Sequence, residues 1–296
     1  MPKLPAFITE RLERWRERRG GPVIPAIRLS GVIGSLPLRG TGISLAGLDR
    51  SLEAVFAPKD APAAVILINS PGGSPVQSSL VGKRIRALAE EKKRPVLAFV
   101  EDVAASGGYW LACAADEIYA DPSSIVGSIG VVSSGFGFQD AIARLGIERR
   151  VHTAGARKTL LDPFRPERPE DLELLKGVQA DIHARFIAWV RSRRGSRLKE
   201  DGEPLFDGTI WTGERALGLG LIDGLAEPRA ILRQRFGDKA RLRFIGPRRG
   251  WLARKLRPDA AGLPDAANLA GPLAADLPRS LLAALEERAH WQRFGL

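Results

Sequence analysis

The sequence holds few of the residues on which disulfide-bonded and metal-binding proteins depend. Cys113 is the one cysteine among 296 residues, which excludes an intramolecular disulfide and a cysteine-rich metal site. The three histidines, His152, His183 and His290, are too few for a multi-histidine metal centre. We therefore expect neither a metal nor a cofactor.

Long apolar runs are also missing. No stretch of about eighteen uncharged apolar residues occurs, so we expect no transmembrane helix. Residues 1–20 carry charges throughout and lack the apolar core of a secretory signal. These absences predict a cytoplasmic protein, either free or peripheral at the inner face of a membrane.

Positive charge is what the sequence has in excess. Its 45 Lys and Arg residues outnumber 34 Asp and Glu residues, which gives a net charge of +11. Residues 239–257 include eight basic residues and no acidic one, interleaved with Trp251, Leu252 and Leu256. Such a segment suits an anionic membrane surface. No recognised nucleic-acid-binding motif accompanies it, so we do not expect nucleic acid as a partner.

The pattern of apolar residues divides the chain into three parts. Residues 1–21 form a charged arm, with an amphipathic helix expected at 8–19. Residues 22–245 form one folded domain. Residues 246–296 form a basic linker, with a helix expected at 280–293.

Strands and helices alternate in the central domain. Strands are expected at 23–29, 63–68, 95–100, 118–120, 129–132 and 148–153. Helices are expected at 48–56, 76–88, 111–115, 138–145 and 170–194, and residues 206–224 contain a short strand, a turn and a helix. This order predicts a mostly parallel sheet with right-handed crossovers, whose ligands bind at the carboxyl ends of the strands.

Ser106 gives the clearest chemical signal. It lies where an apolar strand turns into a helix, and Gly107 and Gly108 follow it directly. The glycines permit a close approach of another backbone and leave N–H groups free to bind negative charge. This position suits a serine that attacks a carbonyl group. Taken alone, however, a Ser-Gly-Gly segment is more often a helix N-cap followed by a turn.

A serine nucleophile needs a neighbouring base. His152 and Lys158 occur together in the segment His-Thr-Ala-Gly-Ala-Arg-Lys, just after a predicted strand. A lysine can serve only if its pKa falls from about 10.4 toward neutrality, which requires about 4 kcal/mol from its surroundings. The segment alone does not distinguish a catalytic lysine from an ordinary surface lysine.

Five motifs in the same order and spacing resemble the signal peptide peptidase A family of serine-lysine proteases. The motifs are Asn69-Ser-Pro-Gly-Gly73, Ala105-Ser-Gly-Gly-Tyr109, Gly127-Ser-Ile-Gly130, Thr153-Ala-Gly-Ala-Arg-Lys158, and Gly213 with Leu221-Ile-Asp-Gly224. The resemblance covers about residues 23–226. It implies an α/β, Clp/crotonase-like fold, with a mostly parallel sheet of repeated ββα units and helical terminal extensions.

The same resemblance assigns the site. It implies that Ser106 is the nucleophile, that Lys158 is the general base and that Ser128 holds the lysine amine. The oxyanion would be bound by backbone N–H groups of Gly72, Gly73 and Gly107.

The family resemblance further implies peptide substrates, such as signal-peptide remnants or membrane-associated and misfolded polypeptides. It also implies a ring-like homo-oligomer, because this single-copy chain resembles half of a tandem member. Whether the serine and lysine meet within one chain or between chains is left open. The transmembrane helix that many members have near the N-terminus has no counterpart here, which makes the usual role in the membrane less secure.

Three alternatives to this assignment are retained. A crotonase-like acyl-CoA enzyme would use the glycine N–H groups without a serine nucleophile. A membrane scaffold with the same fold would need no dyad. Within a protease, His152 could replace Lys158 as the base.

Overall fold

The computed structural model describes residues 20–34, 42–155, 157–200 and 202–246, together with residues 291, 292 and 294. The helix predicted at 8–19 and nearly all of the predicted linker and helix at 246–296 lie outside these residues. The domain boundaries at 21 and 246 therefore stay predictions. Among the described residues, no helix is both long enough and apolar enough to cross a membrane.

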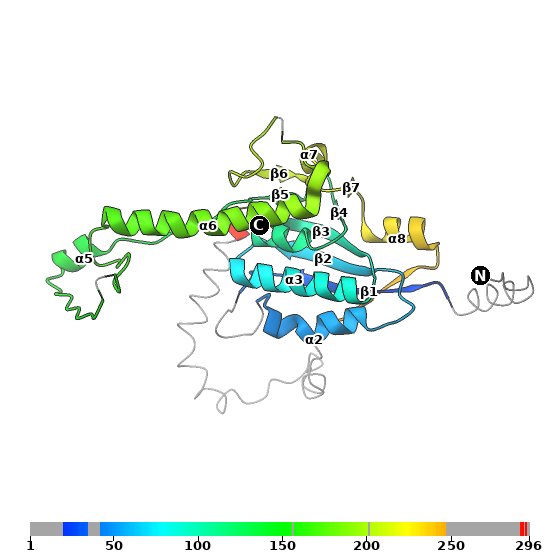
Figure 1. Cartoon of the computed structure of the whole chain (residues 1–296), viewed down its shortest axis with the longest axis horizontal. Helices are drawn as coiled ribbons and strands as arrows, with labels where there is room; N and C mark the ends of the chain where they lie inside the picture. The colour runs from blue at the N-terminus through cyan, green and yellow to red at the C-terminus, as the bar shows by residue number, and fades with distance from the viewer. Residues whose placement is uncertain are drawn as a thin grey trace, which may run out of the picture.

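An eight-stranded sheet forms the middle layer of the protein (Figure 1). The strands are β1 (Val23–Ser30), β2 (Ala64–Ser70), β3 (Val96–Ala105), β4 (Glu117–Ala120), β5 (Ile125–Gly127), β6 (Ile210–Thr212), β7 (Gly224–Leu225) and β8 (Arg241–Phe244). Hydrogen-bonded neighbours follow the order β6-β5-β3-β2-β1-β8, while β4 pairs with the first half of β3 and with β7. The pairs between these strands are parallel except β5 with β6.

Helices cover both faces of this sheet. They are α2 (Leu45–Phe56), α3 (Pro75–Glu91), α4 (Gly107–Ala112), α5 (Gln139–Arg144), α6 (Pro169–Arg194), α7 (Gly213–Gly218) and α8 (Pro228–Phe236). The larger core contains buried side chains of α2, α3, α4 and α6, whereas α8 packs on the opposite face. The α/β architecture and the mostly parallel sheet predicted from the sequence are therefore confirmed.

Strand β2 explains why the sheet lies between two layers. Its side chains alternate between the two cores, with Ile66 and Ile68 in the larger one and Val65 and Leu67 in the smaller one. All four are nearly inaccessible to solvent. A strand buried on both faces is apolar without alternation, which is the pattern that predicted it.

Two predicted strands are wrong. The strand near 129–132 is instead β5, which ends at Gly127 because Gly127 (φ 110°) and Ser128 (φ 53°) adopt left-handed backbone conformations that a strand cannot continue. Residues 148–153 form no strand, because they are mostly exposed and have no neighbouring strand to pair with.

Two elements near the end of the domain were not predicted. Helix α8 has the sequence PRAILRQRF. Its only buried residues are Ile231 and Leu232, and the three arginines around them obscure the apolar pattern in the sequence. Strand β8 has the sequence RLRF and was interpreted only as part of a basic segment. Its Leu242 packs against the smaller core, while β1 supplies its backbone partners.

The predicted apolar face of α3 is half wrong. Ile85 and Leu88 are buried as expected, but Val76 and Leu80 are 64% and 40% exposed. The helix buries Ser78 and Gly82 in their place, because small residues allow α3 to approach α4 closely. Two apolar side chains are thereby left on the surface.

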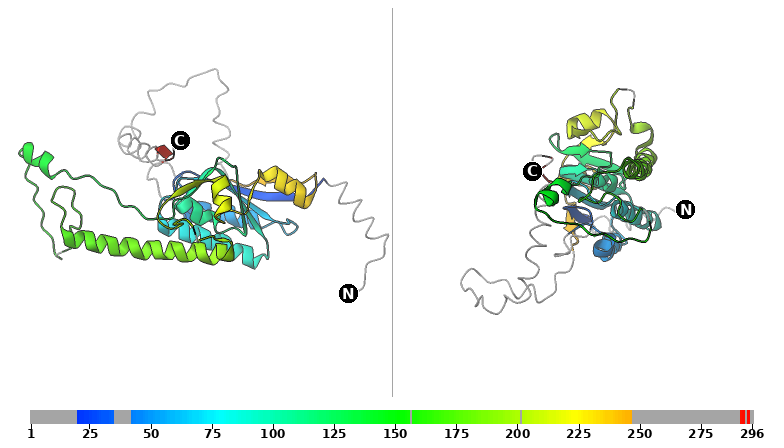
Figure 2. Two further views of the ribbon diagram at one scale, coloured as in Figure 1. Left: turned by 90° about the horizontal axis from the view of Figure 1, so that it is seen from above. Right: turned by 90° about the vertical axis from the view of Figure 1, so that its left-hand side faces the viewer.

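Helix α6 links the core to a projecting part of the molecule. Its carboxyl half is held by buried Phe186 and Val190, whereas its amino half extends beyond the sheet together with α5 (Figures 1 and 2). We call residues 131–181 the arm. Eight of the thirteen large hydrophobic side chains found exposed among the described residues belong to it: Val132, Phe136, Phe138, Leu145, Ile147, Leu160, Leu174 and Val178.

Two of the sequence motifs turn out to tie the fold together. The hydroxyl of buried Tyr109 donates a hydrogen bond to the carbonyl of Leu221 over 2.7 Å. The carboxylate of Asp223 accepts from the N–H of Ile118 (2.7 Å) and pairs with Arg194 (2.7 Å), whose side chain is 2% exposed. The Leu-Ile-Asp-Gly motif thus clamps the end of α6 to the helix that follows the serine.

Asp223→Asn should lower the free energy of unfolding by about 3 kcal/mol, because the buried guanidinium of Arg194 would lose its counter-charge. Urea unfolding at neutral pH measures this difference. Asp140→Asn, at an exposed position on α5, is the matched control and should change stability little.

The effect of Asp223→Asn should depend on pH. Burial opposes ionisation of Asp223, but hydrogen bonds and charge from Arg194 outweigh it and lower the pKa of the carboxyl group. An unfolded aspartate titrates near pH 3.9, so the contribution is present above that pH and is lost as the pH falls through the lower folded pKa. A difference between variant and parent that stays constant from neutral into acidic solution would contradict this interpretation.

Candidate active site

Ser106 occupies a strained turn at the carboxyl end of β3. Its backbone has φ 52° and ψ −121°, a conformation that costs a non-glycine residue about 1–3 kcal/mol. Its side chain forms no capping hydrogen bond with α4, which argues against the simple N-cap interpretation. The N–H of Ser106 donates to the carbonyl of Gly127 (2.8 Å), which fixes the turn.

Glycines are required where this turn meets the turn after β2. A Cβ atom added to Gly72 would lie 2.8 Å from Cβ of Ser106, and one added to Gly107 would lie 2.4 Å from Oγ of Ser78. Gly72 also has φ 107°, a conformation that L side chains rarely adopt. The two glycine pairs predicted at strand ends are therefore packed directly against each other.

Backbone N–H groups near Ser106 are available to bind an oxyanion. Gly73 is held in place because Ile33 exchanges hydrogen bonds with its neighbours Gly72 and Ser74, each over 2.7 Å. The N–H of Gly72 donates to Oγ of Ser70 (3.2 Å). In the described part of the chain, no acceptor is found for the N–H of Gly73 or of Gly107. These two groups therefore fit the predicted oxyanion role better than Gly72 does.

Ser128 lies beside Ser106 because their strands pair in register. Ala105 of β3 is opposite Gly127 of β5, so the two serines follow matched positions. Ser128 has φ 53°, and its N–H donates to the carbonyl of Thr209 (2.7 Å). Ser106 and Ser128 line one cavity of about 770 Å³. Apolar walls of this cavity include Ile33, Val131 and Val132.

The structure does not bring Lys158 to this cavity within one chain. Lys158 is exposed and lies in the segment of the arm that joins α5 to α6. The amino end of α6, where this segment ends, projects away from the sheet (Figure 2). His152, the alternative base, is exposed in the same segment. Neither residue is among those that line the cavity in the described chain.

His183 lines the cavity, although the sequence analysis gave it no role. Its Nε2 lies 3.1 Å from the carbonyl oxygen of Ile129, the residue after Ser128. Because a carbonyl oxygen only accepts, Nε2 must carry the proton. His183 therefore ties α6 to the turn that carries Ser128. In the sequence, His183 directly follows Ile182, which belongs to the predicted apolar face of α6. This position was the one signal that could have pointed to His183.

Asp207 is a second cavity residue that the sequence analysis missed. Hydrogen bonds from Thr209, including one from its backbone N–H (2.9 Å), lower the pKa of the Asp207 carboxyl group. The cavity wall therefore carries a negative charge at neutral pH. Asp207 falls in the stretch 206–224, for which the sequence predicts a short strand, a turn and a helix but no functional residue.

A strained serine at the end of a parallel strand, with unpaired glycine N–H groups beside it, is the arrangement of an α/β enzyme of the Clp/crotonase fold class. The model of peptidase family S49 matches residues 88–235, half of the sequence, and the chain belongs to this family. The family and fold expected from the five motifs are confirmed. The crotonase-like acyl-CoA alternative is not favoured by this membership.

Two curated relatives show how far the similarity extends. The chain is 51% identical over 295 residues to the Na(+)/H(+) antiporter NhaA of Brucella abortus, a match that covers 99% of this chain and 39% of that protein. It is 36% identical over 214 residues to the chloroplastic serine protease SPPA of Arabidopsis thaliana, a match that covers 70% of this chain and 31% of that one. The chain thus spans well under half of either relative, and each name describes the longer protein.

A solved structure also aligns with most of the chain. A membrane-bound stomatin-specific protease is 18% identical, with a TM-score of 0.47, over 77% of this chain and 99% of that one. A score this low supports no conclusion about the site.

Replacing His183 tests its link to the Ser128 turn. His183→Leu removes the donor to Ile129 and should slow peptide hydrolysis about tenfold, the equivalent of one hydrogen bond. His183→Gln can place an amide N–H near the same oxygen and should retain most of the activity. Both variants should unfold at similar temperatures. A glutamine variant as slow as the leucine variant would show that His183 acts through its ring chemistry and not through this hydrogen bond.

Proposed function

We propose that this chain is a serine endopeptidase that cleaves exposed, extended or apolar peptides through an acyl-enzyme. The observation that carries the proposal is the strained Ser106 turn, which opens into a cavity next to the unpaired N–H groups of Gly73 and Gly107. Because the chain belongs to a peptidase family, we interpret Ser106 as a nucleophile that attacks peptide bonds.

The mechanism follows from what each group can donate or accept. The neutral amine of Lys158 takes the proton of Ser106 as the hydroxyl attacks the scissile carbonyl, and then gives it to the leaving amine. The N–H groups of Gly73 and Gly107 stabilise the oxyanion, and Ser128 orients the lysine amine. Water then repeats the sequence and releases the acyl group.

The nucleophile and the base come from different chains of a ring-like homo-oligomer. Two features of a single chain support this: Ser106 lies in a cavity that Lys158 does not line, and Lys158 is exposed on the arm. The arm also exposes most of the large apolar side chains that lack cover in the described chain, and a second subunit would cover them.

Mixing two inactive variants tests both the dyad and its division between chains. Ser106→Ala and Lys158→Ala should each abolish hydrolysis of an unstructured apolar peptide, and the co-assembled mixture should regain activity because some sites combine an intact serine with an intact lysine. His152→Ala is the matched control and should remain active. Loss of activity only in His152→Ala would assign the base to that histidine instead.

Labelling with a fluorophosphonate distinguishes the peptidase from its rivals. The probe should modify the parent chain and not Ser106→Ala. Acyl-CoA turnover that is unaffected by Ser106→Ala would support the crotonase-like enzyme. A double variant of Ser106 and Lys158 that still fulfils the cellular role would support the scaffold.

An anionic membrane surface is the partner that the basic face of the chain suits. We define the basic face as five exposed residues of α8, β8 and the turn between them: Arg229, Arg233, Lys239, Arg241 and Arg243. Phe244 at the end of β8 is 54% exposed beside them and could enter the interface. Each cation near an anionic leaflet contributes about 1 kcal/mol, so reversible peripheral binding is expected. Glu227 and Asp238 border the same surface and would weaken it.

Flotation with lipid vesicles tests this membrane contact. The parent chain should float with anionic vesicles at low salt and much less at high salt, because screening weakens the attraction. Reversal of Lys239, Arg241 and Arg243 to Glu should reduce flotation markedly, and deletion of 246–296 in the same variant should abolish it. Reversal of Arg50, Lys59 and Lys93, which are exposed outside the basic face, should remove less of it. Equal flotation with neutral vesicles would contradict the proposal.

A further inference from the structure

Strand β3 contains a bulge shortly before the turn that carries Ser106. Ile68 of β2 is opposite Val100 of β3. Two residues further along β2, Ser70 is opposite Ala104, which lies four residues beyond Val100. Strand β3 therefore holds two more residues than β2 over this interval. Bulges of this kind bend a strand and re-aim the residues that follow.

The register after the bulge decides which residue of the β2 turn meets Ser106. Beyond the bulge, Gly72 is level with Ser106, and a Cβ atom added to Gly72 would lie 2.8 Å from Cβ of the serine. Without the bulge, the register of the preceding residues would continue, and Gly72 would be opposite Ala104. Ser106 would then extend about 7 Å further past this turn, at about 3.3 Å per residue. The bulge thus keeps the proposed nucleophile beside the turn that holds the N–H group of Gly73.

Two side chains supply partners to the backbone of the bulge, where the ladder of strand hydrogen bonds is interrupted. Oδ1 of Asn69 accepts from the N–H of Val103 over 3.2 Å. The hydroxyl of Ser124, which is 2% exposed, donates to the carbonyl of Glu101 over 2.5 Å. The bulge is therefore fastened at both of its ends, by β2 on one side and by the residue before β5 on the other.

Asp102 determines which way the amide of Asn69 points. Nδ2 of Asn69 donates to Oδ2 of Asp102 over 2.5 Å. A carboxylate only accepts and a backbone N–H only donates, so the amide must turn its NH2 group to Asp102 and its oxygen to Val103. The hydrogen bond to the carboxylate is charge-assisted, which makes it stronger than one between neutral groups. We call Asn69 and Asp102 the bulge clamp.

The bulge clamp lies away from the cavity of Ser106. Neither Asn69 nor Asp102 is among the residues of the described chain that line this cavity. Asp102 instead lines a separate hollow of about 550 Å³, together with Leu67 of the smaller core. A change at Asn69 therefore reaches Ser106 through the backbones of β2 and β3 and leaves the walls of the cavity as they are.

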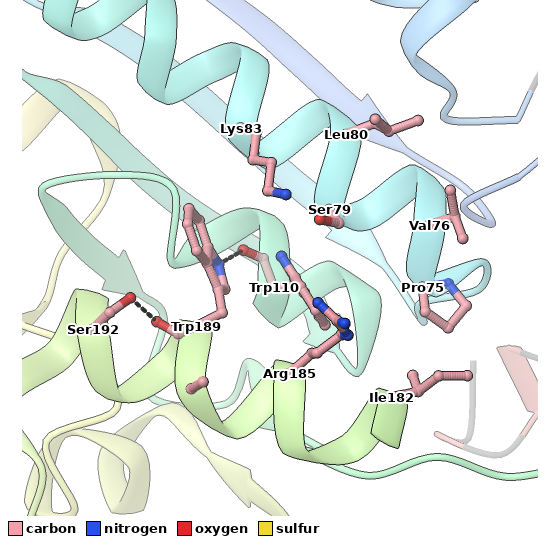
Figure 3. A pocket seen from close by; sticks show the side chains of 11 residues that line it. Pro75, Val76, Ser79, Leu80, Lys83, Trp110, Ile182, Arg185, Trp189 and Ser192 are labelled. Carbon is pink, nitrogen blue, oxygen red and sulfur yellow. Dashed lines mark hydrogen bonds between the residues drawn. The ribbon is translucent and has the colours of Figure 1, made fainter. Parts of the chain in front are cut away.

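The helix that follows Ser106 is held independently of the bulge. In α4, the carbonyl of Trp110 accepts from the indole N–H of Trp189 on α6 over 2.9 Å (Figure 3). The rings of Trp110 and Phe186 also stack, with their centroids 4.8 Å apart. Because α4 is fixed in this way, loosening of the bulge would displace the turn of Ser106 and leave the helix in place.

We propose that Asn69 is a positioning residue for peptide hydrolysis, because it closes the β3 bulge and so holds Ser106 level with the Gly72 turn. This role rests on the proposed function, to which it adds a residue that does not line the cavity. Catalysis requires the nucleophile and the oxyanion donors to meet one carbonyl group together, so it depends on this register. Binding of the substrate to the apolar walls does not. Loss of the bulge clamp should therefore lower kcat and leave KM nearly unchanged.

An exchange of the amide and the carboxylate tests this role. Asn69→Asp puts two carboxylates in contact and should lower kcat about a hundredfold, the cost of misplacing a reacting group by about 1 Å. The double variant Asn69→Asp with Asp102→Asn restores one carboxylate and one amide, with an oxygen still facing Val103, and should recover most of the parent's kcat. A double variant as slow as Asn69→Asp, or a loss that appears in KM instead of kcat, would overturn the proposal.

Hydrogen exchange tests the bulge clamp without using activity. The N–H of Val103 should exchange about tenfold faster in Asn69→Asp than in the parent, the equivalent of one lost hydrogen bond, and should return to the parent rate in the double variant. The N–H of Leu97, in the same strand before the bulge, should keep the parent rate. Trp189→Phe is the matched control, since it removes a hydrogen bond on the other side of Ser106 and should leave Val103 unchanged. Equal acceleration at Val103 and Leu97 would refute a local clamp.

The two measurements separate the bulge clamp from the proposed function. If the exchange pattern is as expected but the parent chain hydrolyses no peptide, the bulge clamp stands and the proposed function is refuted. If the parent and Asn69→Asp hydrolyse peptide at the same rate, the proposed function stands and the positioning role is refuted.

Discussion

The hydrogen bond from the N–H of Ser106 to the carbonyl of Gly127 is the interaction on which the site depends. It continues the β3–β5 ladder by one step beyond the last strand residue and so holds two left-handed turns side by side. Ser106 and Ser128 both have positive φ angles that neither would adopt in isolation. The fold tolerates this backbone strain because β3 is long enough to pair with β2 on one side and with β4 and β5 on the other. A strand that is buried along most of its length thus positions a hydroxyl group, while the glycine turns beside it hold N–H groups for which the described chain provides no acceptor.

The two residues proposed as the dyad lie in regions that differ in burial. Ser106, the proposed nucleophile, belongs to the core, where Tyr109, Asp223 and Arg194 fasten α4 and α6 to the sheet. Lys158, the proposed base, belongs to an exposed arm that has little core of its own. Helix α6 connects the two, and His183 contacts the Ser128 turn where the helix leaves the core. In the proposed homo-oligomer, a second chain would supply Lys158 to the site. The turn that carries Ser106 would not need to change its conformation.

Sequence patterns predicted the buried parts of this structure well, because burial imposes regular periodicity. The apolar run at 63–68 corresponds to β2, and the helix expected at 170–194 corresponds to α6, although only Phe186 and Val190 of its apolar stripe are buried. The glycine motifs identified the close approach around Ser106 correctly. Predictions failed where tertiary contacts decide the outcome. Nothing local distinguishes residues 148–153 from a strand, since only the absence of a neighbouring strand prevents one. Likewise, Val76 and Leu80 follow a helical stripe that α3 turns toward solvent. The motifs leave open whether Ser106 and Lys158 meet within one chain or between chains, and in the single chain Lys158 does not line the cavity of Ser106.

The edges of the sheet have a consequence for the proposed endopeptidase, whose expected substrates are extended peptides. Extended peptides readily add themselves to any long, exposed strand edge. Here the edge strands are the four-residue β8, with arginine at two positions, the three-residue antiparallel β6 and the two-residue β7, which pairs with β4. All three are too short to offer a continuous row of backbone donors and acceptors, and β8 carries charge as well. Unfolded polypeptides are thereby discouraged from accumulating along the sheet as misplaced strands, so a high local concentration of substrate need not seed aggregation.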